Sequence, residues 1–329
     1  MMETKKISVA PMMDCTDRHD RYFLRLISKN TMLYSEMVAT SSVLNGDREK
    51  ILGFNNFEKP LALQLGGSNV KELVNCVKIA EDYGYDEINL NLGCPSKKVQ
   101  KNKFGACLMK EPELVNECLS SMSEATKLPI TAKTRIGFDD TENIDYLNNF
   151  VNKIKSANVK KIILHARKAI LKGLSPKENL KIPKLNYDMV YQIKKDNPEL
   201  DIIINGGITS VEEIEKHLKH VDGVMIGRAI YQNPYFLAEI ENKIFKNFEV
   251  LTREQIVEEL IAYVKYEIQK GTRVNQIMRH AVGLYHGQKG SSKWKRYLSD
   301  NMMARDSDFK KVEHILNVVQ NNEKIQMVN

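Results

Sequence analysis

A cysteine stands where an apolar run gives way to a lysine-rich loop, in the stretch EINLNLGCPSKKVQKNKFGACLM at residues 87–109. Cys94 is flanked by Gly93 and Pro95, and Cys107 follows in the same stretch. A free cysteine is often only a small buried apolar residue. Its thiol is also a proton donor near neutral pH, because its ordinary pKa is about 8.5. Taken alone, Cys94 is explained equally well by packing and by proton transfer.

The cysteines as a set argue against a metal or a disulfide framework. There are five, an odd number without close-paired spacing: Cys15, Cys76, Cys94, Cys107 and Cys118. Neither zinc sites nor disulfide scaffolds have that pattern, and no carboxylate has ligand spacing, so we expect no metal. Cys107 lies where a helix is expected to begin, which favours a packing role. Cys15 follows the first apolar run, and its spacing leaves both roles open.

A second group of residues is suited to hold a flat, phosphorylated ligand. Two apolar runs end in glycine before a helical pattern, which exposes backbone N–H groups to a phosphate. Lys133 would need an anionic ligand or a carboxylate if buried, and Gln64 suits the imide edge of a flavin. His165 is as readily a hydrogen-bonded core residue. The set favours FMN, and its members are Pro11, Met12, Met13, Gln64, Lys133, His165, Asn205, Gly206, Gly207, Gly227 and Arg228.

The elements that must position these residues form a regular alternation. Short apolar runs predict eight strands, at residues 7–12, 33–38, 61–65, 87–93, 130–136, 161–166, 202–206 and 223–227. Amphipathic patterns such as residues 69–84 and 210–220 predict helices between most of them. This favours a (β/α)₈ TIM barrel, in which catalytic groups stand at the carboxyl ends of strands. A doubly wound sheet would show a glycine-rich turn after the first strand, and APMMDCTD has no glycine.

After the barrel pattern only helical patterns remain, at residues 253–270, 273–287 and 308–320. We therefore expect a barrel domain at residues 1–245 and a smaller all-helical domain at 246–329. In the barrel, Cys94 lies one strand from Gln64 and one from Lys133, so its sulfur would reach over a ring held at the mouth. A hydride added to one carbon of a C=C bond requires a proton at the other carbon. Cys94 is the predicted catalytic proton donor.

The bulk composition is that of a soluble globular protein, with 42% hydrophobic and 28% charged residues in 329. No apolar stretch is long enough to span a membrane, and the N-terminal apolar part is too short for a signal peptide, so we expect a cytoplasmic protein. The net charge is +7. Residues 271–299 hold Arg273, Arg279, Lys289, Lys293, Lys295 and Arg296 and no Asp or Glu. That segment is either a solvated helix face or a surface for a polyanion.

Several stretches together resemble the tRNA-dihydrouridine synthase family, and within it the A-type bacterial branch. They are VAPMMDCTDRHDRYFLR, NLNLGCPSKKVQKNKFGACLM, AKTRIG, IILHARKAILKGLSPKEN, INGGI, GVMIGRAIYQNP and MRHAVGLYHGQKGSSKWKRYLS. The resemblance covers residues 9–299. It implies an FMN-bearing barrel and a helical tRNA-binding domain, with NADPH (or NADH) as the electron donor. Hydride would pass to C6 of D-loop uridines at tRNA positions 20 and 20a, and the cysteine of GCP, Cys94 here, would protonate C5.

The resemblance also assigns binding residues. It implies FMN contacts for the cofactor set above, and Asn91 resembles the residue that meets the target nucleotide. Relatives commonly have arginine where this chain has Leu180, and arginines around Trp294, where this chain has lysines. We therefore expect tRNA contacts from Lys177, Lys295 and Arg296, whereas Trp294 either packs or stacks on a base. We expect a monomer that binds neither a membrane nor a metal.

Two other functions fit parts of the sequence. An FMN barrel reductase of the dihydroorotate or enoate type would share the phosphate site and Lys133, but it gives no reason for the acid-free basic segment. An RNA-binding protein without catalysis would explain that segment and would bind no flavin.

Overall fold

The computed structural model describes residues 6–303 and 307–315 of the 329-residue chain. The chain divides into two compact units. The first comprises Met1–Thr16 and Thr31–Gly227, and the second Asp17–Asn30 and Arg228–Asn329.

The first unit is built on eight parallel strands in one sheet, in the order β1-β8-β7-β6-β5-β4-β3-β2. The strands are β1 Lys6–Val9, β2 Leu33–Ala39, β3 Leu61–Gly66, β4 Glu87–Leu92, β5 Ile130–Arg135, β6 Lys161–His165, β7 Asp201–Asn205 and β8 Gly223–Ile226. β1 pairs with β8, and on its other side Ser8 forms a parallel bridge with Met32, just before β2. The Val9 amide donates to the Met32 carbonyl at 2.9 Å, so the ring closes as a TIM barrel.

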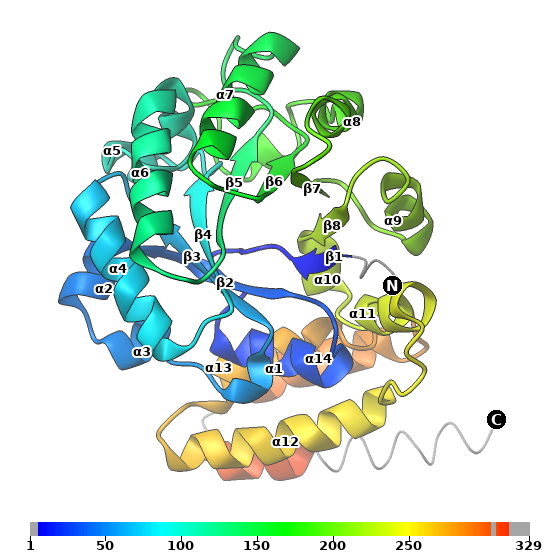
Figure 1. The fold of residues 1–329 in the computed structure, drawn as a ribbon. Helices are drawn as coiled ribbons and strands as arrows, with labels where there is room; N and C mark the ends of the chain where they lie inside the picture. Colours follow the sequence, from blue (N-terminus) through cyan, green and yellow to red (C-terminus); the bar gives the residue numbers. More distant parts are fainter. Residues whose placement is uncertain (1–5, 304–306, 316–329) are drawn as a thin grey trace. The chain divides into compact units, whose positions relative to one another are not determined.

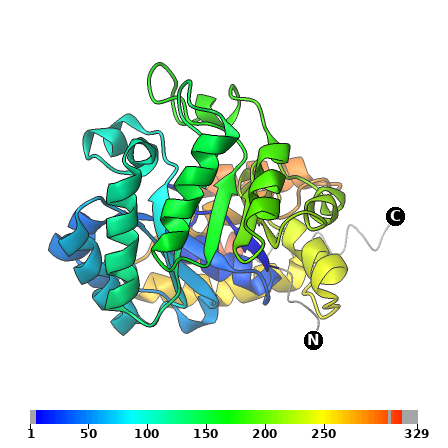
Figure 2. The same cartoon turned by 45° about the horizontal axis from the view of Figure 1, so that its top comes forward.

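Helices surround the strands (Figures 1 and 2). They include α2 Thr40–Asn45, α3 Arg48–Leu52, α4 Val70–Tyr83, α5 Lys97–Lys101, α6 Pro112–Ala125, α7 Ile144–Ser156, α8 Tyr187–Asp196 and α9 Val211–His217, with short turns η1 Asn56–Glu58, η2 Gly105–Lys110 and η3 Glu178–Leu180. Strands buried on both faces explain the near-continuous apolar runs such as Ile202–Ile204. Helices α4 and α9 begin at the polar caps Asn69 and Ser210, and each buries one apolar face.

The barrel and all eight predicted strands are confirmed. The first strand is shorter than predicted and ends at Val9. After Pro11 the chain turns tightly, because the Met12 carbonyl accepts hydrogen bonds from the amides of Cys15 and Thr16 and from the Thr16 hydroxyl. A turn made by a side-chain hydroxyl leaves no trace in the apolar pattern that predicted the strand.

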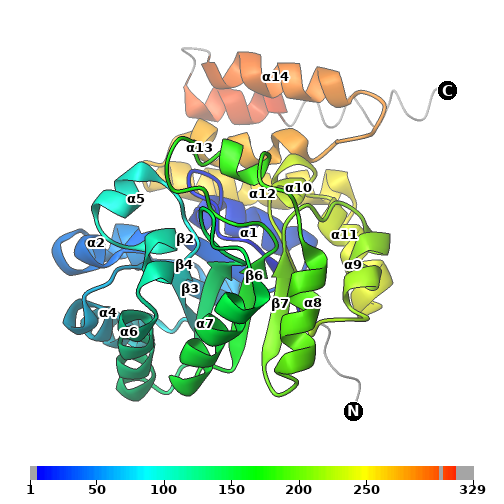
Figure 3. The same ribbon diagram turned by 90° about the horizontal axis from the view of Figure 1, so that it is seen from above.

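The regular elements of the second unit are all helices within its described residues. It contains α1 Arg18–Ile27, α10 Arg228–Gln232, α11 Phe236–Ile240, η4 Glu241–Phe245, α12 Arg253–Gln269, α13 Val274–Met278, η5 Arg279–Gly283 and α14 Ser291–Met303. In its core Tyr22 of α1 stacks on Tyr263 of α12, with ring centroids 3.8 Å apart. α14 packs on α13 and η5 (Figure 3). Residues 308–315 are also helical, and the rest of the predicted helix, 316–320, lies outside the described residues.

Candidate functional site

The carboxyl ends of β3, β4 and β5 bring three of the predicted residues together. Register pairs Gln64 with Asn89 and Asn91 with Lys133. Because side chains alternate along a strand, Asn89 and Asn91 lie on one face of β4, and Lys133 and Arg135 lie on one face of β5. Gln64 and Asn91 are hydrogen-bonded to each other, because the Asn91 Nδ2 donates to the Gln64 Oε1 at 2.8 Å.

Lys133 is a basic side chain whose hydrogen-bond partner is a neutral amide. Its Nζ donates to the Asn205 Oδ1 at 2.9 Å, and the Asn205 Nδ2 donates to the Met225 carbonyl at 2.8 Å. Among the described residues no carboxylate forms an ion pair with Lys133. Burial lowers the pKa of Lys133 to about 7, and the positive charge of Arg135 lowers it further. The side chain is thus prepared for an anionic or electron-rich ligand atom, which would restore its proton.

Arg135 is a site residue that the sequence did not single out. Its Nε donates to the Gly93 carbonyl at 3.0 Å, and its Nη1 to the carbonyls of Lys168 and Asn179, both at 3.1 Å. The guanidinium is buried, which lowers its pKa to about 10. Arg135 therefore joins the cysteine loop to the loop that follows β6. Period-two alternation in TAKTR could have placed it on the Lys133 face, but its partners could not be predicted.

Cys94 lies half-buried in the loop after β4, beside these cations. Its carbonyl accepts the Ala106 amide at 2.9 Å, and Gly105, with φ of +77°, would bring a side-chain Cβ within 2.6 Å of that same oxygen. Burial raises the pKa of Cys94, and the Ser96 N–H and the charges of Arg135 and Lys133 oppose the rise. The thiol is therefore protonated at neutral pH, which is the state that a proton donor needs.

The other thiols have different surroundings. The Cys107 thiol donates to the Phe104 carbonyl at 3.1 Å, as a packed cysteine would. Burial raises the pKa of both Cys76 and Cys118 to about 12. Cys15 lies in the turn after β1, where its amide donates to the Met12 carbonyl at 3.1 Å.

Backbone conformation and packing both require glycine at the two positions after β7. Gly206 and Gly207 have φ of +117° and +76°, a region that L side chains rarely adopt. A Cβ on Gly206 would lie 2.6 Å from the His165 ring, and a Cβ on Gly207 would lie 2.6 Å from the Leu185 side chain. These contacts bring the predicted His165 and the two glycines together. The glycines leave backbone without side chains at the carboxyl end of β7.

The end of β8 is different, and it adjoins the turn after β1. A Cβ on Gly227 would make only ordinary contacts, 3.5 Å from the Met12 Sδ and from the Ala10 Cβ. Packing therefore does not require glycine there. Pro11 and Met12 are half-buried and Met13 is 54% exposed. Arg228 follows Gly227 directly as the first residue of α10.

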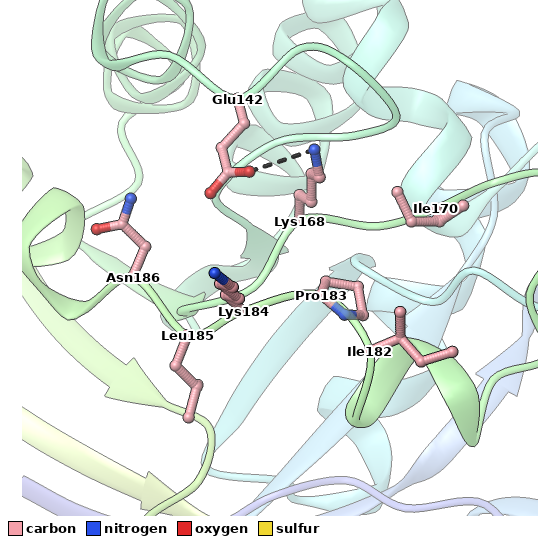
Figure 4. Close-up of a pocket in the computed structure, with 8 residues that line it drawn as sticks. All are labelled: Glu142, Lys168, Ile170, Ile182, Pro183, Lys184, Leu185 and Asn186. Atoms are coloured by element: carbon pink, nitrogen blue, oxygen red, sulfur yellow. Dashed lines mark ion pairs between the residues drawn. The ribbon is translucent and has the colours of Figure 1, made fainter.

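A pocket of about 530 Å³ opens beside the loop that follows β6 (Figure 4). It is lined by Glu142, Lys168, Ile170, Ile182, Pro183, Lys184, Leu185 and Asn186. Lys168 pairs with Glu142 at 3.4 Å, and Lys184 is exposed. Lys177 is exposed on the same loop. This side of the barrel therefore presents several ammonium groups.

The remaining predicted RNA contacts belong to the second unit. Lys295 and Arg296 are exposed on α14, and Arg296 pairs with Asp300 at 3.6 Å. Trp294 is 2% exposed, and its Nε1 donates to the Ala281 carbonyl at 2.9 Å. Of its two expected roles, the structure favours packing, because a buried indole offers no face to a base.

Within residues 6–303 and 307–315, no group of three or more His, Cys, Asp or Glu side chains is arranged to hold a metal ion. The same part of the chain contains no helix with the length and apolar character needed to cross a bilayer.

Comparison with known proteins gives a consistent result. The family model described as "Dihydrouridine synthase (Dus)" matches residues 8–321. A tRNA-dihydrouridine(20/20a) synthase of Shewanella oneidensis is 51% identical over 298 residues, which is 90% of this chain and 89% of that protein. The protein of the same name from Synechocystis is 50% identical over 90% of this chain and 89% of its own length. The one from Escherichia coli K12 is 48% identical over 95% and 91%.

Proposed function

This chain belongs to the dihydrouridine synthase family, and from that premise we propose that it reduces the C5=C6 bond of uridines at positions 20 and 20a of the tRNA D-loop to 5,6-dihydrouridine. The observation that carries the proposal is the pair formed at the mouth of the barrel by Cys94 and Lys133. The Cys94 thiol, whose pKa is raised by burial, lies beside a lysine whose pKa is lowered to about 7 and which forms an ion pair with no described carboxylate. Such a pair suits the addition of a proton and a hydride across a polarised double bond.

The residues at the mouth fit FMN. Lys133 supplies positive charge for an electron-rich ring edge, and Gln64 supplies an amide. Gly206 and Gly207 leave backbone uncovered for a phosphate, and a side chain at either position would collide with its neighbours. Gly227 and Arg228 would complete the phosphate site, with His165, Asn205, Pro11, Met12 and Met13 around the ring. When bound, FMN would carry a hydride from NADPH or NADH to uracil C6.

The chain's own residues do the rest of the work. Cys94 holds the proton that C5 receives, and its raised pKa keeps that proton on sulfur until it is transferred. Asn91 accepts the amides of Gly93 and Cys94 at 3.2 and 3.0 Å and so fixes the loop from which the thiol projects. Arg135 holds the same loop from the other side through the Gly93 carbonyl.

The target base must leave its stack to reach such a site, which costs a few kcal/mol. We propose that Lys177, Lys295 and Arg296 offset this by binding phosphates, and that Lys168 and Lys184 help, so binding should weaken as salt rises. In this proposal residues 1–245 form the catalytic domain and residues 246–329 bind tRNA, in a cytoplasmic protein that acts as a monomer.

The test is reduction of tRNA by the purified protein. Unmodified tRNA, made by transcription, is incubated with NADPH and the protein, and mass spectrometry of nuclease fragments locates the 2 Da gain. Mature tRNA that already carries dihydrouridine is the control. The proposal requires a yellow protein and reduction at positions 20 and 20a. Reduction of dihydroorotate-type or enoate substrates with no change in tRNA would support the small-molecule reductase instead, and a colourless protein that binds tRNA would support the non-catalytic alternative.

A further inference from the structure

Glu87 is a buried carboxylate at the start of β4, three residues before Leu90 and seven before Cys94 in the chain. It is 2% exposed and forms an ion pair with Lys161 of β6 through its Oε2. Its other oxygen, Oε1, accepts the hydroxyl of Tyr34 at 2.6 Å and the hydroxyl of Thr131 at 2.7 Å. None of these contacts belongs to the site as described so far.

A chain of hydrogen bonds leads from this carboxylate toward the mouth. Thr131 has a single hydroxyl proton and donates it to Glu87, so toward Asn89 its oxygen can only accept. The Asn89 Nδ2 accordingly donates to the Thr131 Oγ1 at 2.9 Å. Asn89 must then present its carbonyl oxygen to Gln64, and the Gln64 Nε2 donates to it at 2.8 Å.

The same logic continues to the cysteine loop. Gln64 is left with its Oε1 toward Asn91, whose Nδ2 donates to it at 2.8 Å. Asn91 is left with its Oδ1, which accepts the backbone amides of Gly93 and Cys94. A carboxylate that only accepts stands at one end, and amides that only donate stand at the other. Both ends therefore require the same orientation of all three side-chain amides, and every residue from Glu87 to Asn91 in this chain of hydrogen bonds is buried.

We propose that Glu87 is a positioning residue: through Thr131 and Asn89 it fixes the orientation of the Gln64 and Asn91 amides and thereby the loop that carries Cys94. The inference rests on the proposed function only for the roles of Gln64, Asn91 and Cys94. It predicts that Glu87, at the amino end of β4, sets the orientation of the buried side-chain amides that lead to Cys94, which follows the carboxyl end of the same strand.

Tyr34 provides a matched control. Its hydroxyl donates to the same Glu87 oxygen as Thr131, but within the described part of the chain no hydrogen bond continues from Tyr34 toward Asn91. Burial and the charge of Glu87 raise the pKa of Tyr34, so it stays a donor. Tyr34→Phe thus removes a hydrogen bond of similar length from Glu87 without breaking the chain. Thr131→Val removes one from the chain at nearly constant volume. Glu87→Gln places an amide NH₂ against either the Lys161 ammonium or the two hydroxyls, so donors meet donors.

The experiment compares these three variants with the parent protein. The first readout needs neither flavin nor tRNA: the rate at which iodoacetamide alkylates Cys94 in flavin-free protein, followed by mass spectrometry of the Cys94 peptide. The second is the FMN dissociation constant, and the third is kcat and KM for unmodified tRNA. Thermal unfolding measures the purely structural effect. We expect Thr131→Val and Glu87→Gln to change the alkylation rate severalfold and to weaken FMN binding by about tenfold. Tyr34→Phe should lower only the melting temperature.

Two results would overturn the inference. One is an equal loss of melting temperature in all three variants with Cys94 alkylation and FMN affinity as in the parent, which would make Glu87 purely structural. The other is a Tyr34→Phe effect on Cys94 as large as that of Thr131→Val. Should Glu87→Gln not fold, Thr131→Val and Tyr34→Phe decide the question between them. A parent protein that fails to reduce tRNA would overturn the proposed function, while the alkylation comparison would still test the hydrogen-bond chain.

Discussion

The barrel mouth and the second unit hold their cationic side chains in different ways. At the barrel mouth Lys133 donates to the neutral amide of Asn205, and Arg135 donates to three backbone carbonyls. In the second unit Arg279 pairs with Asp17 at 2.6 Å, and Arg18 pairs with Glu267 at 2.9 Å. There the cations meet carboxylates of their own chain.

The difference separates a structural use of charge from a functional one. A cation paired with a carboxylate already has its counter-charge, and removing it takes one partner from a largely buried acid. A buried cation held only by neutral oxygens keeps a net field that a ligand can use. The depressed pKa of Lys133 reflects that condition. We therefore expect variants at the mouth to change ligand binding or catalysis, and variants of the Arg18 and Arg279 ion pairs in the second unit to change stability.

The largest expected effect is at the thiol beside these cations. Cys94→Ala should lower the rate of tRNA reduction by roughly 10² or more, because the proton for C5 loses its donor. FMN binding and NADPH oxidation by the enzyme should remain near parent values. Cys107→Ala is the control, since that thiol bonds only to the Phe104 carbonyl among the contacts described. Stopped-flow spectroscopy measures the two half-reactions, reduction of the flavin by NADPH and its oxidation by tRNA, separately for each variant. Full tRNA turnover by Cys94→Ala would remove it from the mechanism.

Lys133→Met should have opposite effects on binding and on stability. Losing the cation should weaken FMN binding roughly 10- to 100-fold, as for a charged hydrogen bond. The same change should raise the free energy of unfolding near neutral pH by roughly 1 kcal/mol or more, because a charge no longer has to be buried. In the folded protein the pKa of Lys133 is about 7, below its ordinary value, so the folded state binds fewer protons from pH 7 to about 10.5. The gain should therefore be largest at and below pH 7 and shrink toward pH 10.5.

Arg18→Met in the second unit is the matched control for Lys133→Met. It removes a cation that is paired with the nearly buried carboxylate of Glu267. It should lower the free energy of unfolding and leave the FMN dissociation constant unchanged. Denaturant titration and flavin fluorescence measure the two quantities. If Lys133→Met and Arg18→Met destabilise the protein alike, the contrast between the two regions is wrong.

A smaller effect separates Gly227 from the glycine pair Gly206–Gly207 at the mouth. Gly227→Ala should leave stability within about 0.5 kcal/mol of the parent, because the added methyl group makes only ordinary contacts. If a phosphate approaches the backbone there, FMN affinity should still fall. Gly207→Ala should lower stability by at least about 1 kcal/mol, since φ is +76° and the Cβ would meet Leu185. Unchanged FMN affinity in Gly227→Ala would remove that residue from the phosphate site.

How far the sequence could predict these features depends on the range of the interaction. The strands follow from local apolar runs, and Lys133 and Cys94 follow from their places at strand ends. The hydrogen bonds of Arg135 with the loop after β6, and the chain from Glu87, depend on register between strands that are distant in sequence. Grouping α1 with residues 228–329 is likewise invisible, because a helical period is the same in either unit. The residue types at the end of one strand can be predicted from that strand alone. The orientation of their side chains depends on hydrogen bonds with neighbouring strands.

The last expected effect lies in the second unit, where burial outweighs the neighbouring positive charges at Asp20. Burial raises the pKa of Asp20 to about 7; the charges of His280, Arg21 and Arg279 oppose the rise and that of Asp17 adds to it. The folded state thus keeps a proton that the unfolded chain releases near pH 4, so this group makes stability fall as pH rises from about 4 to 7. Asp20→Asn should flatten that fall, by at most about 1.4 kcal/mol for each pH unit. Unfolding by urea at several pH values measures the slope. Glu241→Gln is the control, because the pKa of Glu241 is lowered, so its contribution is lost only at more acidic pH, and Glu241 is not among the groups that shift the pKa of Asp20. An unchanged slope in Asp20→Asn would mean that His280 and the arginines hold the pKa of Asp20 in its ordinary range, so that Asp20 does not cause the fall in stability.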